Sequence, residues 1–202
     1  MPQSEAKVVR QGTALAVPKT KARRPALAAE GMAVPKRHAS VAGTYFVTSR
    51  TWESHAVFSV EQNCSTFIDI LFHYRDQNIF ALHSFVLMPD HFHILLTPGP
   101  GTTLERAVQF IKGGSAHRMR SDRPSAFPLW QRGFSDHRIR EAGDYTAHVR
   151  YIEQNPIRKR LVISARDYRW SSASGSYKMD PAPQGLKPIE RAAAVGAAKA
   201  VP

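Results

Sequence analysis

The sequence predicts an α+β fold, a ferredoxin-like split βαβ arrangement with a mostly antiparallel sheet and an added C-terminal helix. Segments with strand and helix patterns follow one another in the order strand, helix, strand, strand, helix, strand, helix. The two middle strands are separated only by Pro89-Asp90, which is typical of a hairpin. No segment is repeated along the 202 residues, so we expect one domain of ordinary size.

The first strand and the first helix follow from their apolar patterns. Residues 44–51 carry Tyr45, Phe46, Val47 and Thr48 and predict a strand. Residues 65–77 place apolar side chains at helical spacing, namely Phe67, Ile68, Leu71 and Phe72.

The hairpin strands are the apolar runs 79–87 and 91–97, so the second strand begins at His91. Side chains in a strand alternate between the two faces of a sheet. His91 and His93 therefore share one face, and Phe92 and Ile94 point to the other face, where a core can receive them.

The second helix is predicted to start after Thr102 or Thr103, either of which can cap it, and to run to about Arg120. Gly113-Gly114 lies inside this pattern and favours a break in the helix over a close approach by DNA backbone.

A short strand is expected over residues 134–139. Asp144 is then predicted to cap the last helix, and Pro156 is predicted to end it. This helix carries, at spacings of three and four, Ala147, His148, Tyr151, Ile152 and Asn155.

The composition points to a polyanionic partner. The formal charge is +12 and the isoelectric point is about 10.3, which favours nucleic acid first and an anionic membrane surface second. The single cysteine, Cys64, excludes an internal disulfide and indicates a reducing compartment, so we expect a cytoplasmic location. Neither a membrane-spanning run nor a signal peptide is expected.

Composition also divides the chain into three parts. Residues 1–42 are expected to form a disordered basic arm, residues 43–175 the folded domain, and residues 176–202 a low-complexity tail. Within the domain, positive charge is concentrated in the later half, which holds fourteen Lys and Arg against seven acids over residues 105–170. We expect that half to face the polyanion.

The candidate chemistry rests on His91, His93, Tyr151 and Asn155. Helical residues four apart lie on one face, so Tyr151 and Asn155 can address the same point. Two imidazoles and an amide oxygen can hold Mg²⁺ or Mn²⁺ and leave positions open for substrate oxygens. Tyr151 is then the candidate nucleophile on phosphorus, because a tyrosine hydroxyl is a better leaving group than a sugar hydroxyl and its phosphate ester is reversible.

Each of these residues also has a simpler interpretation. A His-x-His strand can be a polar face, a helical tyrosine is usually core or surface, and Asn155 can be a helix stop. For His148 we favour simple exposure over orienting the phenol, and for Asp90 we favour a hydrogen bond to a backbone amide of the turn. Trp130 and Phe134 can either stack on bases or belong to the core.

Three longer segments carry a resemblance to a known family. They are FVLMPDHFHILL from residue 85, LWQRGFSDHRIR from residue 129 and HVRYIEQNP from residue 148. Together they resemble the REP-associated tyrosine transposases, which are HUH single-tyrosine transposases with an IS200-like transposase domain. The resemblance spans roughly residues 43–175.

This resemblance implies an enzyme that binds hairpin-forming single-stranded DNA such as REP palindromes and cleaves and rejoins it. It implies a 5′-phosphotyrosine intermediate and a free 3′-hydroxyl. The family's metal histidines fall on His91 and His93, its nucleophile on Tyr151 and its amide ligand on Asn155. Where Arg160 stands the family commonly has glycine, so a tight turn there is in question. The insertion-sequence relatives assemble the site between subunits, whereas the REP-associated members resemble single-chain enzymes, so the resemblance favours a monomer over a homodimer with shared sites.

Basic residues of the domain are the candidate contacts to DNA phosphates. They are Arg106, Lys112, Arg118, Arg120, Arg132, Arg138, Arg140, Arg158, Lys159 and Arg160. Two alternatives to strand transfer stay open at this point. One is a phosphodiesterase in which the same metal activates water, and the other is a non-catalytic protein that binds DNA hairpins.

Overall fold

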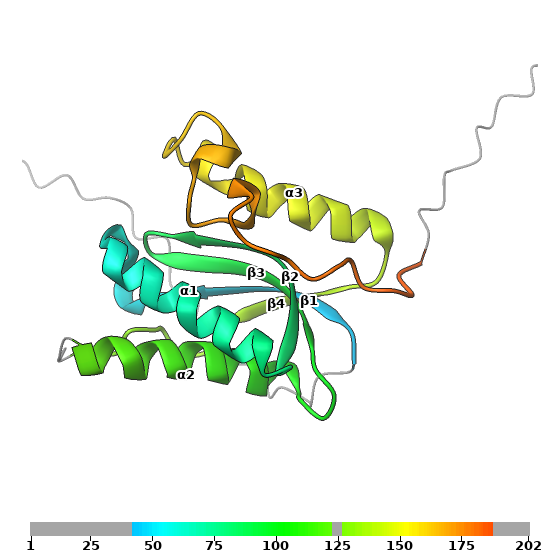
Figure 1. Ribbon diagram of the computed structural model, residues 1–202, viewed down its shortest axis with the longest axis horizontal. Helices are drawn as coiled ribbons and strands as arrows, with labels where there is room; N and C mark the ends of the chain where they lie inside the picture. The colour runs from blue at the N-terminus through cyan, green and yellow to red at the C-terminus, as the bar shows by residue number, and fades with distance from the viewer. Residues whose placement is uncertain (1–41, 123–126, 188–202) are drawn as a thin grey trace, which may run out of the picture. The chain divides into compact units, whose positions relative to one another are not determined.

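The computed structural model describes residues 42–122 and 127–187, which form the elements labelled in Figure 1. In chain order these are β1 (Thr44–Arg50), α1 (Glu61–Asp76), β2 (Phe80–Met88), β3 (His91–Pro98), α2 (Leu104–Asp122), β4 (Ser135–Ile139) and α3 (Ala142–Arg158). Short 3-10 turns lie at Trp52–Ser54, Val57–Ser59, Ala165–Asp167 and Ser172–Ser174. The predicted order of strands and helices is confirmed.

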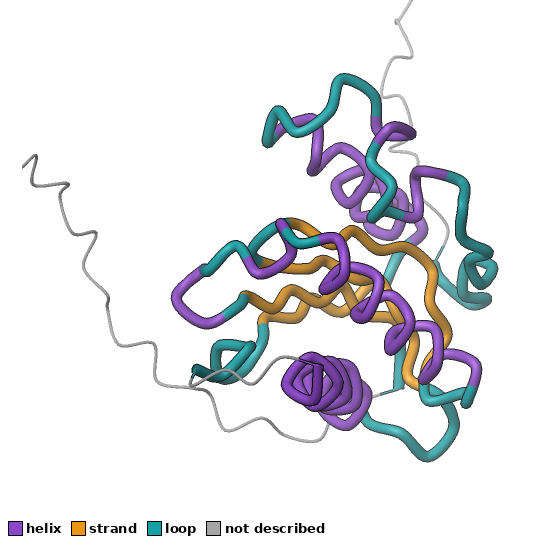
Figure 2. The backbone as a smooth tube through the Cα atoms, turned by 60° about the vertical axis from the view of Figure 1, so that its left-hand side comes forward, coloured by secondary structure: helices purple, strands orange, loops and turns teal. Residues whose placement is uncertain are grey.

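The four strands form one sheet in the order β2-β3-β1-β4, and all neighbouring strands are antiparallel. Helices α1 and α2 lie on one face of this sheet, and α3 lies on the other (Figures 1 and 2). The predicted α+β, split βαβ fold is therefore confirmed.

Alternation along the strands separates two apolar clusters. On the side of α1 and α2, the buried core includes Phe67 and Leu71 of α1 together with Phe92 and Ile94 of β3. On the side of α3, a smaller cluster includes Leu95 of β3 and Ile152 of α3. Because Phe92 and Ile94 occupy the larger core, the odd-numbered side chains at the start of β3 face α3.

The first two helices differ from expectation in detail. Helix α1 begins at Glu61, before the predicted start at residue 65. The prediction missed this first turn because the turn is polar and carries no apolar period. Helix α2 begins after Thr103, whose Oγ1 accepts a hydrogen bond from the backbone N–H of Arg106 at 3.2 Å, as predicted for a cap.

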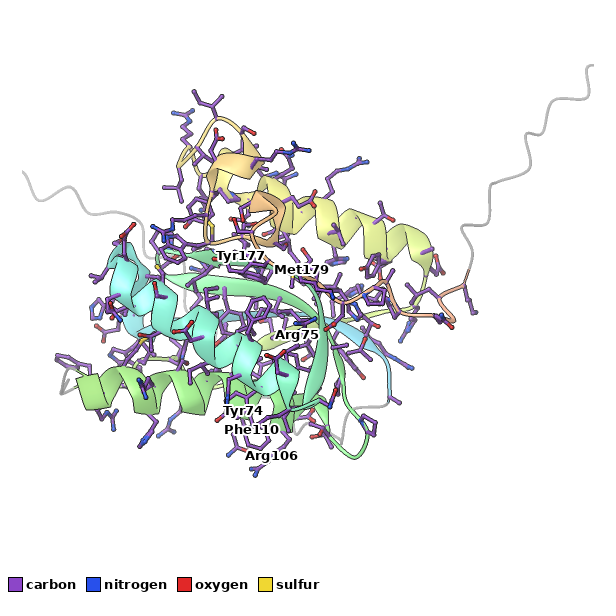
Figure 3. All side chains as sticks on the ribbon, in the orientation of Figure 1. Tyr74, Arg75, Arg106, Phe110, Tyr177 and Met179 are labelled. Carbon is purple, nitrogen blue, oxygen red and sulfur yellow. The ribbon has the colours of Figure 1, made fainter. Side chains whose placement is uncertain are left out.

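The predicted break at Gly113-Gly114 is wrong, because α2 is continuous through both residues. A Cβ on Gly114 would lie 2.7 Å from Cε2 of Tyr74 and 3.1 Å from Cγ2 of Ile70, both on α1. Gly114 thus allows α1 and α2 to approach closely. Figure 3 shows Tyr74 of α1 beside Phe110 of α2.

Both predicted ends of α3 are also wrong. The helix begins at Ala142 after Glu141, so Asp144 lies within its first turn, and it continues through Pro156 to Arg158. Pro156 is buried, and the lost backbone hydrogen bond falls within the last turn. The chain then turns at Arg160, which has a φ of 56°. The tight turn therefore exists without glycine.

The packed chain extends beyond the expected boundary at residue 175. Tyr177 and Met179 pack against the main core, as Figure 3 shows. Asp180 binds Arg75 of α1 through two hydrogen bonds of 2.6 and 2.9 Å and accepts a third from the N–H of Leu82. The low-complexity composition of this segment does not prevent packing, because its few large side chains contact the core.

Most of the predicted arm and the end of the predicted tail, residues 1–41 and 188–202, lie outside the described residues. Among the helices that are described, none is long and apolar enough to span a bilayer.

Candidate active site

His91 and His93 lie side by side on the face of the sheet that α3 covers. Each is only 5% exposed, and their ring centroids are 4.8 Å apart. Both stand in the first three residues of β3, directly after the hairpin turn. The strand geometry expected from the His-x-His spacing is thus present.

Hydrogen bonds fix the orientation of both imidazoles. Nδ1 of His91 lies 2.5 Å from Oδ1 of Asp90, whose other oxygen accepts a hydrogen bond from Arg50 at 3.1 Å. Nδ1 of His93 lies 2.7 Å from Oγ1 of Thr48 on the neighbouring strand β1. With Nδ1 engaged in each ring, Nε2 is the atom left to ligate a cation, as in other metal sites whose histidines are oriented by a second hydrogen bond.

Burial keeps both rings neutral. Desolvation is the main cause that lowers the pKa of His93 to about 3, and the neighbouring His91 and Arg50 contribute in the same direction. Desolvation also lowers the pKa of His91, against the opposing effect of Asp90. A neutral imidazole offers a lone pair, which is the form that binds a metal ion.

Tyr151 of α3 reaches this histidine pair. Its ring centroid lies 5.2 Å from that of His93, and its side chain is 36% exposed. Phe46 of β1 packs against both rings, at 5.2 Å from His93 and 5.7 Å from Tyr151. The guanidinium of Arg158 lies 5.4 Å from the centre of the Tyr151 ring. The phenol therefore stands at the rim of the site, next to a cation and open to solvent.

Asn155 lies one helical turn beyond Tyr151, but its side chain is only 4% exposed. Its Oδ1 is buried and has no hydrogen-bond partner among the described residues. Such an atom normally costs about 1 to 3 kcal/mol unless something binds it. An unpartnered amide oxygen and two neutral imidazoles are donor types that suit a divalent cation such as Mg²⁺ or Mn²⁺.

The candidate DNA-binding residues fall into separate groups. Arg158 is the last residue of α3, Lys159 and Arg160 follow it, and the charge of Lys159 helps lower the pKa of His91. The cations of α2 lie on the opposite face of the sheet, where Lys112 binds the carbonyls of Gln131 and Gly133. In the labelled view, Arg106 lies beside Phe110, 4.5 Å from its ring centre (Figure 3).

The remaining candidates are Arg118, Arg120, Arg132, Arg138 and Arg140. All of these except Arg138 are exposed. Arg138 is half-buried and donates a hydrogen bond to the carbonyl of Ala42. The basic residues thus do not form one continuous face, and those that follow Tyr151 along α3 are the ones beside the candidate site.

Two other expectations change in the structure, and one open alternative is decided. Asp90 hydrogen-bonds the imidazole of His91, not a backbone amide as expected, because the ring follows it directly in the chain. His148 is half-buried: it packs on Phe46 and bonds Asp144, and its expected exposure is wrong. Trp130 is core, with its indole N–H donating to Oγ of Ser115.

Thr48, Phe46 and Asp90 belong to this site, although the sequence did not single them out in these roles. Asp90 had a usable signal, because a carboxylate next to a candidate ligand can orient it. Thr48 and Phe46 had none, since their approach depends on the register of β1 against β3, in which Thr48 pairs with His93.

Comparisons with known proteins identify relatives of this chain. A family model described as "Transposase IS200 like" matches residues 42–155. A REP-associated tyrosine transposase of Escherichia coli (strain K12) is 30% identical over 112 residues, which are 55% of this chain. The chain spans only 62% of the length of that relative.

The solved structure of a REP-associated tyrosine transposase bound to a REP hairpin is also similar to this chain. It is 25% identical, with a TM-score of 0.58, and the match covers 73% of this chain and 90% of the other.

Proposed function

Because the family model covers residues 42–155, the chain belongs to the IS200-like transposase family, and we propose that it cleaves and rejoins single-stranded DNA with Tyr151 as the nucleophile. The observation that carries this proposal is the position of the partly exposed Tyr151 phenol beside the buried pair His91 and His93. A nucleophile next to a candidate metal site is the arrangement that phosphoryl transfer requires.

The proposed substrate is single-stranded DNA that folds into a hairpin, as in REP-like palindromes. Support comes from the solved relative, which is bound to a REP hairpin, and from the net charge of +12. The cations that follow Tyr151, namely Arg158, Lys159 and Arg160, are exposed and are proposed to bind the phosphates next to the scissile bond.

In the proposed step, Oη of Tyr151 attacks the scissile phosphorus. The Oη–P bond forms as the bond from phosphorus to the 3′ oxygen breaks. The phenolic proton is lost to solvent, and the departing 3′ oxygen takes up a proton to become a free hydroxyl. The product is a 5′-phosphotyrosine. Attack by a 3′-hydroxyl on that ester reverses the step and joins strands.

His91, His93 and Asn155 are proposed to hold Mg²⁺ or Mn²⁺. When bound, the cation would offset negative charge on the phosphate and orient the scissile bond. The Asp90 carboxylate accepts from Nδ1–H of His91 and so favours the tautomer that presents Nε2, and the hydroxyl of Thr48 orients the ring of His93 through its Nδ1. Phe46 keeps one side of the site apolar, and Arg158 can reach a phosphate beside Tyr151.

The test uses a radiolabelled hairpin oligonucleotide taken from the organism's own palindromic repeats, with and without Mg²⁺ or Mn²⁺. The intact protein should form a covalent adduct that survives denaturing electrophoresis. Tyr151→Phe should form none. Tyr145→Phe on the same helix is the matched control and should form the adduct normally.

Each other outcome contradicts the proposal in a different way. An adduct with Tyr151→Phe would mean another nucleophile. Cleavage by Tyr151→Phe without an adduct would indicate the water-activating phosphodiesterase. Salt-sensitive binding by the intact protein, without cleavage under either metal, would indicate a hairpin-binding protein that lacks catalysis.

A further inference from the structure

A second group of ligating side chains lies between β4 and α3, separate from the candidate active site. Nε2 of His137 is 2.8 Å from Oδ2 of Asp144, and Nδ1 of His148 is 2.9 Å from Oδ1 of the same carboxylate. One ligand atom from each residue lies within 4.8 Å of the others. The two imidazoles stack with centroids 4.9 Å apart and planes 17° from parallel.

The fold builds this cluster from two elements. Asp144 and His148 are four residues apart on α3, so they share one face of the helix. His137 comes from β4, which pairs with β1 at the edge of the sheet. The three side chains thus connect the first turns of α3 to the edge of the sheet.

We propose that His137, Asp144 and His148 bind a zinc ion that fastens the start of α3 to β4. Two imidazole nitrogens and one carboxylate oxygen are a donor set that Zn²⁺ takes up with tetrahedral geometry, and the fourth position is left for water. The side chain of His137 is 53% exposed, whereas Asp144 and His148 are 28% and 23% exposed. An ion can therefore enter from the side of His137.

The two histidines use different oxygens of Asp144 for hydrogen bonding. Nε2 of His137 hydrogen-bonds the carboxylate at 2.8 Å, whereas Nδ1 of His148 hydrogen-bonds the backbone carbonyl at 2.9 Å and also lies 2.9 Å from Oδ1. Zn²⁺ would take the place of the proton that His137 shares with the carboxylate, and the bond of His148 Nδ1 to the backbone carbonyl would be given up for the ion.

Because of where this site lies, bound zinc can affect the candidate active site through packed side chains. The ring of His148 lies 4.7 Å from that of Phe46, and Phe46 packs against both His93 and Tyr151. A cation that fixes His148 therefore fixes the first turns of the helix that carries Tyr151. Zinc binding itself does not depend on strand-transfer activity, so it stands or falls separately from the proposed function.

The experiment is a titration of the metal-free protein with Zn²⁺ by calorimetry, repeated with Co²⁺ to read its visible absorption. His137→Gln keeps a hydrogen-bond donor to Asp144 but removes the imidazole ligand. It should bind one equivalent less than the wild type and lose the absorption of one tetrahedral Co²⁺. The matched control, His55→Ala, removes another exposed histidine, at 56% exposure, and should bind like the wild type.

Thermal unfolding gives a second readout that does not use activity. In His91→Ala, which lacks a ligand of the candidate active site, zinc at a hundredfold excess over its dissociation constant should raise the midpoint by about 5 to 10 °C. Adding His137→Gln should abolish that rise. Unchanged stoichiometry in His137→Gln, or an equal rise with and without His137, would overturn the proposal.

Discussion

At the scale of single residues, the buried side-chain oxygen of Asn155 allows a test between two roles for this residue, metal ligand and structural amide. Within residues 42–122 and 127–187 its Oδ1 has no hydrogen-bond partner, so removing it should cost little stability. We predict that Asn155→Ala weakens Mn²⁺ binding by at least about 10- to 100-fold. In the presence of a chelator, its free energy of unfolding should change by less than about 1 kcal/mol.

The measurements are Mn²⁺ titration and urea unfolding of the metal-free protein. The neighbouring amide supplies the control, because Gln154→Ala on the same helix should bind Mn²⁺ normally. A loss of 1 to 3 kcal/mol in Asn155→Ala with unchanged Mn²⁺ affinity would instead make Asn155 a structural residue.

The residues of the site differ in how far sequence could predict them. The period of two in a strand is enough to place His91 and His93 on one face, and the structure agrees. The partners of these rings depend on the alignment of separate strands. Thr48 meets His93 only because β1 pairs with β3 in one register, and no local pattern encodes that choice.

At the scale of elements, Gly113 and Gly114 should respond oppositely to the same substitution. Alanine is favoured over glycine inside a helix by up to about 1 kcal/mol. A Cβ on Gly113 meets open space, so Gly113→Ala should raise the free energy of unfolding by about 0.5 to 1 kcal/mol. A Cβ on Gly114 would overlap Tyr74, so Gly114→Ala should lower it by about 1 to 2 kcal/mol.

Urea unfolding of the two variants beside the wild type checks this pair. If both alanines stabilise the protein, the close approach of α1 and α2 at Gly114 is wrong. A third variant, Gly114→Ala with Tyr74→Leu, should recover part of the loss because the smaller side chain removes the overlap.

The turn after α3 gives a second prediction at this scale. Arg160 has a φ of 56°, a conformation that costs a residue with a Cβ about 1 kcal/mol and costs glycine almost nothing. Arg160→Gly should therefore raise the free energy of unfolding by about 0.5 to 1 kcal/mol. It should also weaken hairpin binding and reduce the salt dependence of binding by about one phosphate contact, if Arg160 binds DNA as proposed.

Urea unfolding and a salt series of binding measurements read the two effects separately. Arg166→Gly, in an exposed 3-10 turn, serves as the control for loss of charge alone. A destabilised Arg160→Gly protein would contradict the strain at residue 160, and an unchanged salt slope would remove Arg160 from the DNA-binding set.

The order of elements was more predictable than their ends. Apolar period alone separates strands from helices here, so the βαββαβα order follows from the sequence. The ends depend on tertiary contacts. Pro156 was expected to end α3, but the buried proline is held in the last turn, where one missing N–H is tolerated. Asp144 bonds two histidines instead of capping the helix.

At the scale of the whole molecule, the ion pair between Asp180 and Arg75 ties the C-terminal segment to the domain. Arg75 lowers the pKa of the Asp180 carboxyl, and the N–H of Leu82 and the buried His83 act in the same direction. A lowered carboxyl pKa stabilises the fold at every pH above the ordinary value of about 3.9, and this stability is lost as pH falls through the lowered pKa.

We therefore predict that Asp180→Asn lowers the free energy of unfolding by about 1 to 3 kcal/mol at pH 7. The difference from the wild type should stay constant down to about pH 4 and shrink below it. Urea unfolding of both proteins from pH 7 to pH 3 measures this. A difference that grows toward acid pH would contradict the role of Asp180.

The last prediction concerns how many chains complete one site. Tyr151 reaches His93 of its own chain, so one folded chain contains all the proposed catalytic groups. His93→Ala and Tyr151→Phe should each be inactive in adduct formation, and an equimolar mixture should stay inactive. If two subunits exchanged α3, random pairing would make half of the dimers mixed, each with one complete site, and about a quarter of the wild-type activity would return. The mixture should be refolded together before the assay, so that any dimers can exchange chains, and wild type diluted with Tyr151→Phe provides the control. Activity proportional to the wild-type fraction in that control, with none in the mixture of variants, is the result expected of a site that each chain builds for itself.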